Sequence, residues 1–527
     1  MMKASDLLVR CLETEGVEYV FGLPGEELEA LLFSLRDSDI QFIPVRHEQG
    51  AAFMADVHGR LTGEAGVCLS TLGPGATNLL TGVADAHLDK SPLVAITGQG
   101  GLERLHQESH QALDIVHMFE PVVKWNTQIT DAEIIPESVR KAFKLAEYEK
   151  PGATHIEFPE DVAAQELDAE PLPTRPRVRR AAPDERSLDH AVELLEDADT
   201  PLVLAGNGAV RTSTANRLRE LVDHAGMPVV ATYMGKGAVS DRLDNSLMTL
   251  GSGPQSEAST AISRADCVLA VGYDIAEHDP RSWNADLDKA IIHVDHEPAE
   301  VYRHYNADVE IIADISTVLR ELRMHLDSAS GPEWCQDLRE RIVADVQRKP
   351  ESDDPFSVKR TLPFLREVMA DEDILLSDVG SHKMAIAQNF PTYEPNTCII
   401  SNGLASMGIA VPGGIAADLA TDANVVVATG DGGFLMNAAE IETATRLDLG
   451  YTIVVFNDDD YGLISENQVA HTGEHFGTEL TNPDFERFAE SFGIDSYRPE
   501  TWGEVETVLE SVVPANDMSL VEITLGQ

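Results

Sequence analysis

Two acidic segments of the chain directly follow apolar runs and could bind a metal ion together. The strand-like run 424–429 leads into Gly430-Asp431-Gly432-Gly433, and the run 451–456 ends at Asn457-Asp458-Asp459-Asp460. Glycines at a strand-to-helix turn let backbone N–H groups approach a phosphate, and Mg²⁺ prefers oxygen ligands in octahedral geometry. A Gly-Asp-Gly turn alone also suits an ordinary strand–helix connection, but the Asn-Asp pair after the next strand makes the pattern specific. We therefore predict a diphosphate at Gly430, Gly432 and Gly433, with Mg²⁺ bound by Asp431, Asp458 and Asp460.

The elements around these segments predict the fold. Short apolar runs that end at Gly or Pro alternate with helix-period segments, such as 434–447, in three stretches of the chain. This rhythm is typical of α/β domains, so we expect three doubly wound parallel-sheet domains, at 1–165, 188–325 and 356–527. Segments rich in Pro and charge, within 163–188 and 326–356, are expected to be linkers or surface crossovers. Asp431 and Asp458 should end neighbouring strands, at the edge where such sheets bind ligands.

The composition narrows the functions that the chain can have. Of its 527 residues, 90 are acidic and 39 basic, a net charge of −51 that repels nucleic acid and anionic membranes. The acids are dispersed, and Lys (11) is scarcer than Arg (28), which indicates adaptation to a salt-rich cytoplasm; a merely acidic enzyme is the alternative. No apolar run of about 18 residues occurs, and residues 1–20 predict an amphipathic helix instead of a signal peptide. Five scattered cysteines fit free thiols, so we expect a cytoplasmic protein without membrane or nucleic-acid partners.

Further sequence motifs accompany the Gly-Asp-Gly and Asn-Asp segments and are distributed over nearly the whole chain. They are Phe21–Gly25, Arg46–Ala52, Gly73–Asn78, Asp378–His382 and Ile400–Gly408. With the Gly-Asp-Gly and Asn-Asp signature, the chain resembles the thiamine diphosphate-dependent acetolactate synthase family. The segments that are similar to its catabolic, FAD-free branch are Ser109–Asp114, Gly272–Asp274, Glu277, Asp279–Arg281, Trp283-Asn284 and Ile292–Asp295. The resemblance implies a pyrimidine-binding domain, a central domain and a diphosphate-binding domain, in that order.

The resemblance assigns the catalytic chemistry to three residues. Glu48 stands where the family places the glutamate that shares a proton with N1′ of the pyrimidine, which lets the cofactor's own amino group deprotonate the thiazolium. Gly25 lies in a loop that must pass close to the reacting carbon. Gln111 carries an amide that could bind an oxygen of an intermediate or of the acceptor. An ordinary turn glycine and a surface glutamine are the respective alternatives.

Other residues are expected to contact the cofactor itself. Pro74 and Asn78 match positions beside the pyrimidine, and Met407 matches the large apolar residue under the bent cofactor, although core packing would suit it equally well. The remaining residues of the predicted cofactor-binding set are Gly380, Ser381, His382, Ala405 and Leu463.

Several departures from the family pattern concern the substrate and a second cofactor. Leu463-Ile464 replaces a Met-Val pair, and Asn467 stands where biosynthetic relatives carry a Trp associated with 2-oxobutyrate as acceptor. Asp458 replaces a second Asn but is an excellent Mg²⁺ ligand. Gly206-Asn207-Gly208 lacks the third glycine of a dinucleotide fingerprint, and with the catabolic-like pattern this predicts that FAD is absent.

The expected activity is the condensation of two molecules of pyruvate to 2-acetolactate with loss of CO₂. The resemblance implies a homodimer or homotetramer in which Glu48 of one chain serves the cofactor of its neighbour. Two alternatives stay open: another 2-oxo-acid decarboxylase or carboligase on the same scaffold, and a catalytically silent regulatory homologue. The presence of Glu48, Asp431 and Asp458 argues against the silent homologue.

Overall fold

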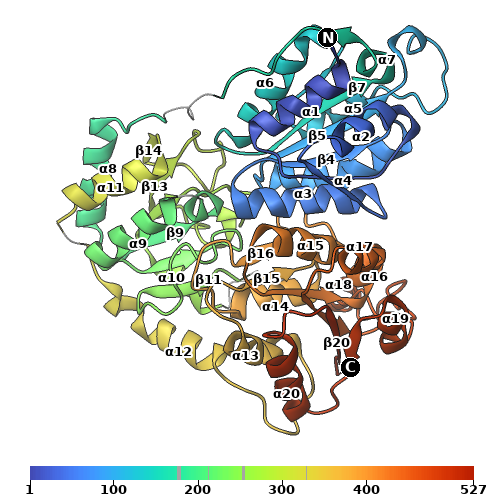
Figure 1. The fold of residues 1–527 in the computed structure, drawn as a ribbon. Helices are drawn as coiled ribbons and strands as arrows, with labels where there is room; N and C mark the ends of the chain where they lie inside the picture. Colours follow the sequence, from blue (N-terminus) through green and yellow to red (C-terminus); the bar gives the residue numbers. More distant parts are fainter. Residues whose placement is uncertain (175–179, 212, 252–255, 328, 527) are drawn as a thin grey trace. The chain divides into compact units, whose positions relative to one another are not determined.

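The computed structural model describes residues 1–174, 180–211, 213–251, 256–327 and 329–526. Within these ranges, three six-stranded sheets follow one another along the chain, and every strand pair in them is parallel (Figure 1). This confirms the predicted fold class. A short antiparallel ribbon pairs β1 (Met2–Lys3) with β8 (Glu166–Leu167).

The first sheet has the strand order β3-β2-β4-β5-β7-β6. Its strands β4, β5 and β7 are buried along their whole length, because helices cover both faces of a parallel sheet. The chain order reverses between β2 and β4, which makes their carboxyl ends the switch point where open sheets bind ligands. The elements are β2 (Tyr19–Gly22), β3 (Gln41–Pro44), β4 (Gly66–Ser70), β5 (Leu93–Gln99), β6 (Trp125–Gln128) and β7 (Ala153–Pro159), with α1 (Ala4–Glu15), α2 (Glu29–Arg36), α3 (Glu48–Thr62), α4 (Pro74–Leu88), α5 (Ile115–Phe119), α6 (Ile135–Glu147) and α7 (Glu160–Ala163).

The third sheet repeats this topology, with the order β16-β15-β17-β18-β20-β19. Its switch point lies between β15 and β17. The elements are β15 (Ile374–Ser377), β16 (Cys398–Ile400), β17 (Val425–Gly430), β18 (Thr452–Asn457), β19 (Asp495–Tyr497) and β20 (Ser519–Thr524), with α13 (Val358–Val368), α14 (Ser381–Asn389), α15 (Ala410–Ala420), α16 (Asp431–Asn437), α17 (Ile441–Arg446), α18 (Gly462–Thr472), α19 (Phe485–Phe492) and α20 (Trp502–Val512).

The middle sheet has a different order, β11-β10-β9-β12-β13-β14, and its switch point lies between β9 and β12. Alternate residues of each strand enter two separate cores: Val203 and Leu269 pack on one face, Leu204 and Val268 on the other. The elements are β9 (Pro201–Ala205), β10 (Val229–Ala231), β11 (Ser246–Thr249), β12 (Cys267–Val271), β13 (Ala290–Asp295) and β14 (Val309–Ile312), with α8 (Glu185–Asp197), α9 (Thr214–Ala225), α10 (Glu257–Arg264), α11 (Ile315–His325) and α12 (Gln336–Val346).

The predicted domains 1–165, 188–325 and 356–527 each enclose one of these sheets. The segment 326–356, expected to be a linker, instead contains α12, which packs against α10 and buries Leu338 in the middle core. The other expected linker, 163–188, lies partly outside the described residues. None of the described helices combines the length and the apolar composition that a bilayer crossing requires.

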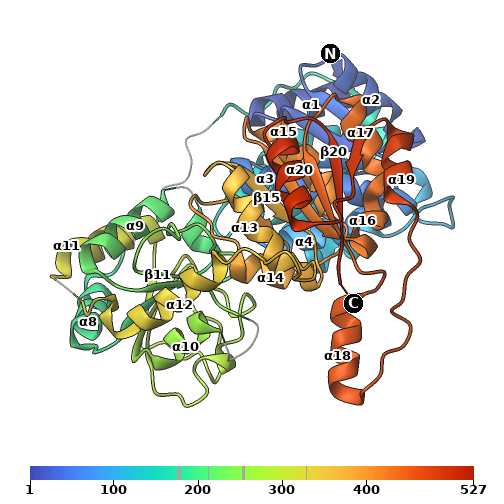
Figure 2. The same ribbon diagram turned by 90° about the horizontal axis from the view of Figure 1, so that it is seen from below.

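The chain divides into two compact units that do not coincide with the three sheets. Unit 1 comprises Met1–Val178, Leu404–Asp422 and Phe434–Leu449, and unit 2 comprises Arg179–Gly403, Ala423–Gly433 and Gly450–Gln527. Two helices of the predicted third domain (356–527), α15 and α17, therefore belong to unit 1. There α15 packs against α3. In unit 2, Figure 2 shows α18 extending away from the third sheet, and Ser465 is its one buried residue.

An ion cluster holds α3 against α4 inside unit 1. The Arg60 guanidinium donates to both carboxylate oxygens of Asp56, at 2.9 and 3.0 Å, and to Asp89 at 2.6 Å. Asp85 lies 3.5 Å away, and the three aspartates are at most 4% exposed. Removing one partner from such a cluster leaves buried charge uncompensated. This matters for function because α3 begins at Glu48 and α4 carries Asn78.

Arg60→Met should therefore lower the free energy of unfolding by about 3–5 kcal/mol, because buried carboxylates would lose their counter-ion. Urea denaturation at fixed salt measures the change. Arg10→Met is the matched control: its ion pair with Glu170 is 3.0 Å long but exposed, so its loss should cost less than about 1 kcal/mol. Equal effects of the two substitutions would contradict a stabilising role for the buried cluster.

Candidate active site

The two aspartates of the predicted metal site end adjacent strands in unit 2. Gly430, the last residue of β17, pairs with Phe456 on β18, so Asp431 and Asp458 follow at the same edge of the sheet. This confirms the predicted placement. Asp431 is 1% exposed, and its carboxyl group hydrogen bonds with that of Asp458.

The electrostatics of this pair favour a cation. Burial raises the pKa of Asp431 even though Asn482 donates a hydrogen bond to it. Burial, and next the charge of Asp431, raises the pKa of Asp458 to about 6. Two carboxyl groups that share a proton because they cannot both ionise cheaply are a suitable donor set for a divalent cation, which removes the repulsion.

Asp460 does not join this pair in a three-carboxylate cluster. The described residues contain no group of three or more His, Cys, Asp and Glu side chains that could hold a metal ion. The pKa of Asp460 is lowered because hydrogen bonds from Ser465 and Thr478 outweigh the effect of burial. A site with two protein carboxylates fits Mg²⁺, which commonly takes one or two carboxylates and completes its shell with phosphate oxygens and water. Metal binding at Asp431, Asp458 and Asp460 stays a prediction.

The switch point beside this pair carries an imidazole with an unused nitrogen. His382, on the first turn of α14, is 4% exposed, and burial lowers its pKa to about 4. Its Nε2 atom is buried and has no hydrogen-bond partner. The ring lies against two glycines: a Cβ on Gly380 would come within 2.9 Å of it, and one on Gly430 within 3.3 Å. The ring also hydrogen bonds to the backbone carbonyl of Asp378, so the single proton of the neutral imidazole is on the other nitrogen and Nε2 is an acceptor.

Glycines allow close packing along the rest of this edge. A Cβ on Gly433 would lie 3.1 Å from the carboxyl carbon of Asp378, and one on Gly432 would lie 2.7 Å from the Tyr461 ring. Side chains at these positions would displace the acidic segments. Ser381 and Asp458 both approach Gly462, the first residue of α18, and Leu463 follows it in a half-buried position.

Asn482 is a site residue that the sequence did not indicate. Its Nδ2 atom donates to Asp431 at 2.5 Å, to Asp459 at 2.8 Å and to the Asn457 side chain at 3.1 Å. It therefore ties the end of β17 to the end of β18. No local pattern marks Asn482, because its partners lie 23 or more residues away along the chain.

The second group of predicted residues meets at the carboxyl edge of the first sheet, in unit 1. Glu48 is the first residue of α3 and is 5% exposed. The Asn78 side chain donates to its Oε2 atom at 3.0 Å, and a Cβ on Gly75 would lie 3.3 Å from Oε1. An amide donor at this distance fixes the orientation of the carboxyl group.

Glu440 positions the segment before Glu48 and was also missed. Its Oε1 atom accepts the backbone N–H groups of Arg46 at 2.9 Å and of His47 at 3.0 Å. Burial raises the pKa of Glu440, and Thr443 donates to its other oxygen. The residue lies in the 3₁₀ turn Ala438–Glu440 between α16 and α17. Nearly 400 residues separate it from His47 in the sequence, so the contact depends on tertiary structure.

The predicted catalytic glycine and glutamine lie on neighbouring loops of the same edge. A Cβ on Gly25 would lie 2.4 Å from the Cβ of Thr71, so close packing against the loop after β4 requires glycine there. Gln111 is exposed and has a left-handed backbone, with φ of 57°. Its carbonyl oxygen approaches Gly73, next to the exposed Pro74. Their roles in catalysis stay predictions.

Ala405 and Met407 belong to unit 1 and not to the unit that carries Asp431. Both are half-buried, and Ala405 has a left-handed backbone with φ of 55°. The Asn437 side chain donates to the carbonyl of Gly408 at 2.7 Å and thereby ties this segment to the end of α16. Cofactor contact by these two residues stays a prediction.

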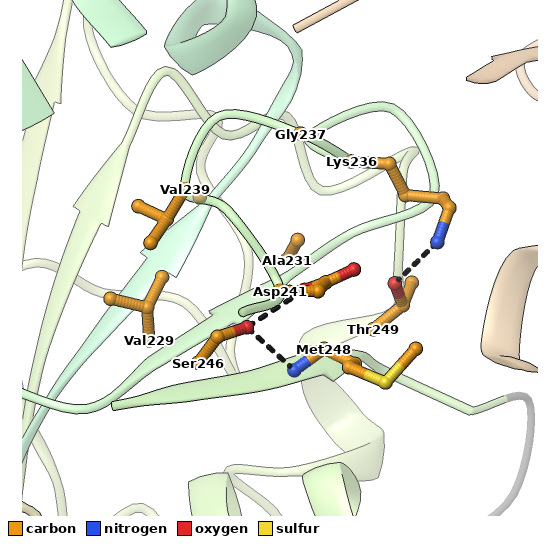
Figure 3. Close-up of a pocket in the computed structure, with 10 residues that line it drawn as sticks. Val229, Ala231, Lys236, Gly237, Val239, Asp241, Ser246, Met248 and Thr249 are labelled. Carbon is orange, nitrogen blue, oxygen red and sulfur yellow. Dashed lines mark hydrogen bonds between the residues drawn. The ribbon is translucent and has the colours of Figure 1, made fainter. Parts of the chain in front are cut away.

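A cavity in the middle domain, shown in Figure 3, is not a second candidate. Its volume of about 10 Å³ is that of a single water molecule, far below the size of a cofactor or a 2-oxo acid. The buried amine of Lys236 at its wall donates to Thr249 at 3.3 Å and to the carbonyls of Ala387 and Phe390 at 3.1 and 2.8 Å. This lysine caps the carboxyl end of α14, where a cation is favourable.

Comparisons with known proteins identify the family of this chain. The descriptions of three matching family profiles are: thiamine pyrophosphate enzyme, N-terminal TPP binding domain, at residues 2–118; central domain, at 188–322; and C-terminal TPP binding domain, at 378–523. A probable acetolactate synthase large subunit of Methanocaldococcus jannaschii is 33% identical over 99% of this chain and 92% of its own length. The acetolactate synthase of Bacillus subtilis is 32% identical over 99% and 93%.

A third relative, named as a catabolic acetolactate synthase, comes from Raoultella terrigena and is 32% identical over 98% of this chain and 94% of its own. The chain belongs to the thiamine diphosphate-dependent acetolactate synthase family. It is therefore an enzyme. The two TPP-binding domain matches overlap the first and third sheets: the first spans β2 to β5, and the second begins directly after β15.

We expect Asp458→Ala to lose thiamine diphosphate at micromolar cofactor, because the diphosphate would face a cation with an incomplete ligand set. Cofactor content after gel filtration in Mg²⁺ measures the loss. Asp495→Ala removes an exposed carboxylate from the same domain and should retain the cofactor. If Asp458→Ala bound thiamine diphosphate as tightly as the unmodified enzyme, the assignment of Asp458 as a metal ligand would be wrong.

Glu48→Gln should bind the cofactor normally but turn over roughly 10²–10⁴-fold more slowly, the usual contribution of a general acid–base group. The amide keeps the shape of the side chain but cannot share a proton. Cofactor titration and kcat separate these effects, and Glu29→Gln on the exposed face of α2 is the control. An unchanged kcat would show that Glu48 is only structural.

Proposed function

We propose that this enzyme condenses two molecules of pyruvate to 2-acetolactate and releases one CO₂. The observation that carries the proposal is the hydrogen bond of 3.0 Å from Asn78 to the buried Glu48 carboxyl group, in a chain similar along its length to three acetolactate synthases. A carboxyl group oriented in a dry position can hold a proton on a pyrimidine nitrogen. A silent homologue would have no chemical need for this arrangement.

The residues of unit 1 would control one proton. Asn78 fixes the Glu48 carboxyl group from one side, and Glu440 fixes the backbone that leads into it. Because Glu48 is enclosed, water competes little for its hydrogen bond to N1′ of the pyrimidine. Gln111, exposed beside Gly73, is available to an oxygen of the substrate.

The residues of unit 2 would hold the diphosphate. Asp431 and Asp458 would bind Mg²⁺, His382 would lie beside the diphosphate at the start of α14, and the glycines of the Gly430–Gly433 turn would admit the phosphate oxygens. Thiamine diphosphate, when bound, supplies the electron sink that accepts the electrons left by departing CO₂. The chain supplies orientation, proton control and exclusion of water.

The start of α18 supports pyruvate as the acceptor. Leu463 is half-buried, Ile464 is 51% exposed, and Asn467 is exposed one turn further on. The indole that biosynthetic relatives carry in place of Asn467 is absent, so nothing here favours an ethyl group over a methyl group. A single methylene contact is worth only about 1–3 kcal/mol of discrimination. Pyruvate is therefore expected to accept at least as well as 2-oxobutyrate.

With pyruvate alone, the holoenzyme should form 2-acetolactate as its main product. With pyruvate and 2-oxobutyrate in equal amounts, 2-acetolactate should at least equal acetohydroxybutyrate, for the reason just given. Chromatographic product analysis at low and high KCl measures both. Acetaldehyde as the dominant product would support the simple decarboxylase instead, and no product from any 2-oxo acid would support the silent homologue.

We also propose a homodimer or a dimer of dimers in which Glu48 of one chain serves the cofactor of its neighbour. Glu48→Gln and Asp458→Ala would then complement each other, since one site of a mixed dimer has both residues intact. Random exchange of subunits should restore about a quarter of the original activity. Activity no higher than the sum of the separate variants would mean that Glu48 acts within its own chain. Each variant mixed with itself is the control.

A further inference from the structure

The middle sheet has a glycine turn at its switch point, which is where doubly wound folds bind dinucleotides. The turn Gly206-Asn207-Gly208 follows β9, and the segment from Gly272 follows β12. These are the two strands at the switch point of the sheet. In dinucleotide-binding domains, the backbone N–H groups of such a turn and the start of the helix after it bind a pyrophosphate.

All three backbone donors of the turn are used inside the chain. The N–H of Gly206 donates to the carbonyl of Val271 at 3.0 Å, and that of Gly208 to the carbonyl of Gly272 at 2.8 Å. The N–H of Asn207 donates to the Glu277 carboxyl group, at 3.0 and 3.1 Å to its two oxygens. A phosphate could gain these donors only by breaking existing hydrogen bonds.

Glycine packing closes the same gap from both sides. A Cβ on Gly208 would lie 2.7 Å from the Cα of Gly272, and one on Gly272 would lie 2.4 Å from the Cα of Gly208. Gly272 has a φ of 56°, a conformation that favours glycine. Here the glycines bring the two backbones into contact instead of admitting a ligand.

The Glu277 carboxyl group connects three strand ends. Besides Asn207 after β9, it accepts from Thr232 Oγ1 after β10 at 2.5 Å and from the backbone N–H of Asp274 after β12 at 3.1 Å. Burial, and next the charge of Asp274, raises the pKa of Glu277 to about 8, as expected of a carboxyl group enclosed by protein. The Asn402 side chain donates to its backbone carbonyl at 3.4 Å.

The helix that should complete a dinucleotide site is also displaced. The glycine turn leads into a 3₁₀ segment, Asn207–Val210, and α9 begins only at Thr214. The positive end of α9 is therefore not at the glycine turn, and it cannot add its dipole to phosphate binding there.

We infer that Glu277 is the built-in ligand of this turn: it occupies the Asn207 donor, whereas backbone carbonyls accept the other two N–H groups of the turn, and it holds the ends of β9, β10 and β12 together. The middle domain then binds no FAD or other dinucleotide. Its switch point has a structural role, because it connects the ends of three strands. Glu277 is the residue that determines this selectivity.

The first test uses the full-length holoenzyme with saturating thiamine diphosphate and Mg²⁺, so that the diphosphate site is filled. After incubation with FAD and gel filtration, the protein should be colourless. Flavin retained at one molecule per chain would overturn the inference.

The second test compares Glu277→Ala with Glu193→Ala, which removes an exposed carboxylate from α8 of the same domain. FAD fluorescence anisotropy and the melting temperature with inorganic phosphate are measured at fixed salt. Glu277→Ala should bind FAD or phosphate at least about tenfold more tightly than Glu193→Ala or the unmodified enzyme, because the Asn207 donor is released. Equal affinities in all three proteins would show that Glu277 does not close the crevice.

Glu277→Gln covers the case in which the alanine variant does not fold. The amide fills the same volume but cannot accept at both of its terminal atoms, so it should give a smaller gain in the same two measurements. Affinity unchanged from that of the unmodified enzyme in this variant would also overturn the inference.

Discussion

The enclosed pair of carboxyl groups at Asp431 and Asp458 is the constraint on which the rest of the site depends. Two carboxyl groups in hydrogen-bond contact repel each other when ionised, and burial strengthens that repulsion. The chain keeps them together by the parallel pairing of β17 with β18 and by Asn482, which contacts both strand ends. The cost of this arrangement is offset when a divalent cation is bound. Under the proposed function, folding of the third sheet would prepare a place for a cation before the cofactor binds.

The first and third sheets have equivalent strand orders, and both place their predicted functional residues at the carboxyl ends of the strands. In each, the predicted functional residues follow the carboxyl ends of strands at or next to the switch point: Glu48 follows β3, and Asp431 and Asp458 follow β17 and β18. The first sheet uses this edge to enclose the Glu48 carboxyl group, which accepts a hydrogen bond from Asn78. The third uses it to bury an imidazole and to pair two carboxyl groups. The middle sheet has its own order, and there Glu277 fills the corresponding edge from within the chain.

The sequence was sufficient to predict the features that a local pattern of apolar residues determines, such as strands and their ends. The buried run 424–429 and the run 451–456 identified two strand ends, and a parallel sheet necessarily brings such ends to one edge. The helix expected at 434–447 was only partly right, because a 3₁₀ turn at Ala438–Glu440 divides it into α16 and α17. That turn carries the Glu440 carboxyl group that accepts two N–H groups of the first sheet. Contacts of this kind, like those of Asn482 and Glu277, join segments with no shared pattern and could not be predicted.

The net charge of −51 raises the question of how this chain can bind anions at all. Both thiamine diphosphate and a 2-oxo acid carry negative charge, so the summed field of the protein opposes their approach. Screening limits the range of that field to about 10 Å at 0.1 M salt and about 3 Å at 1 M, whereas buried groups in contact are screened far less. Under the proposed function, anion binding would therefore come from contacts at the strand ends, chiefly a cation held between Asp431 and Asp458. Because salt screens distant surface charges more strongly than groups in contact, added salt would weaken the opposing field more than these contacts.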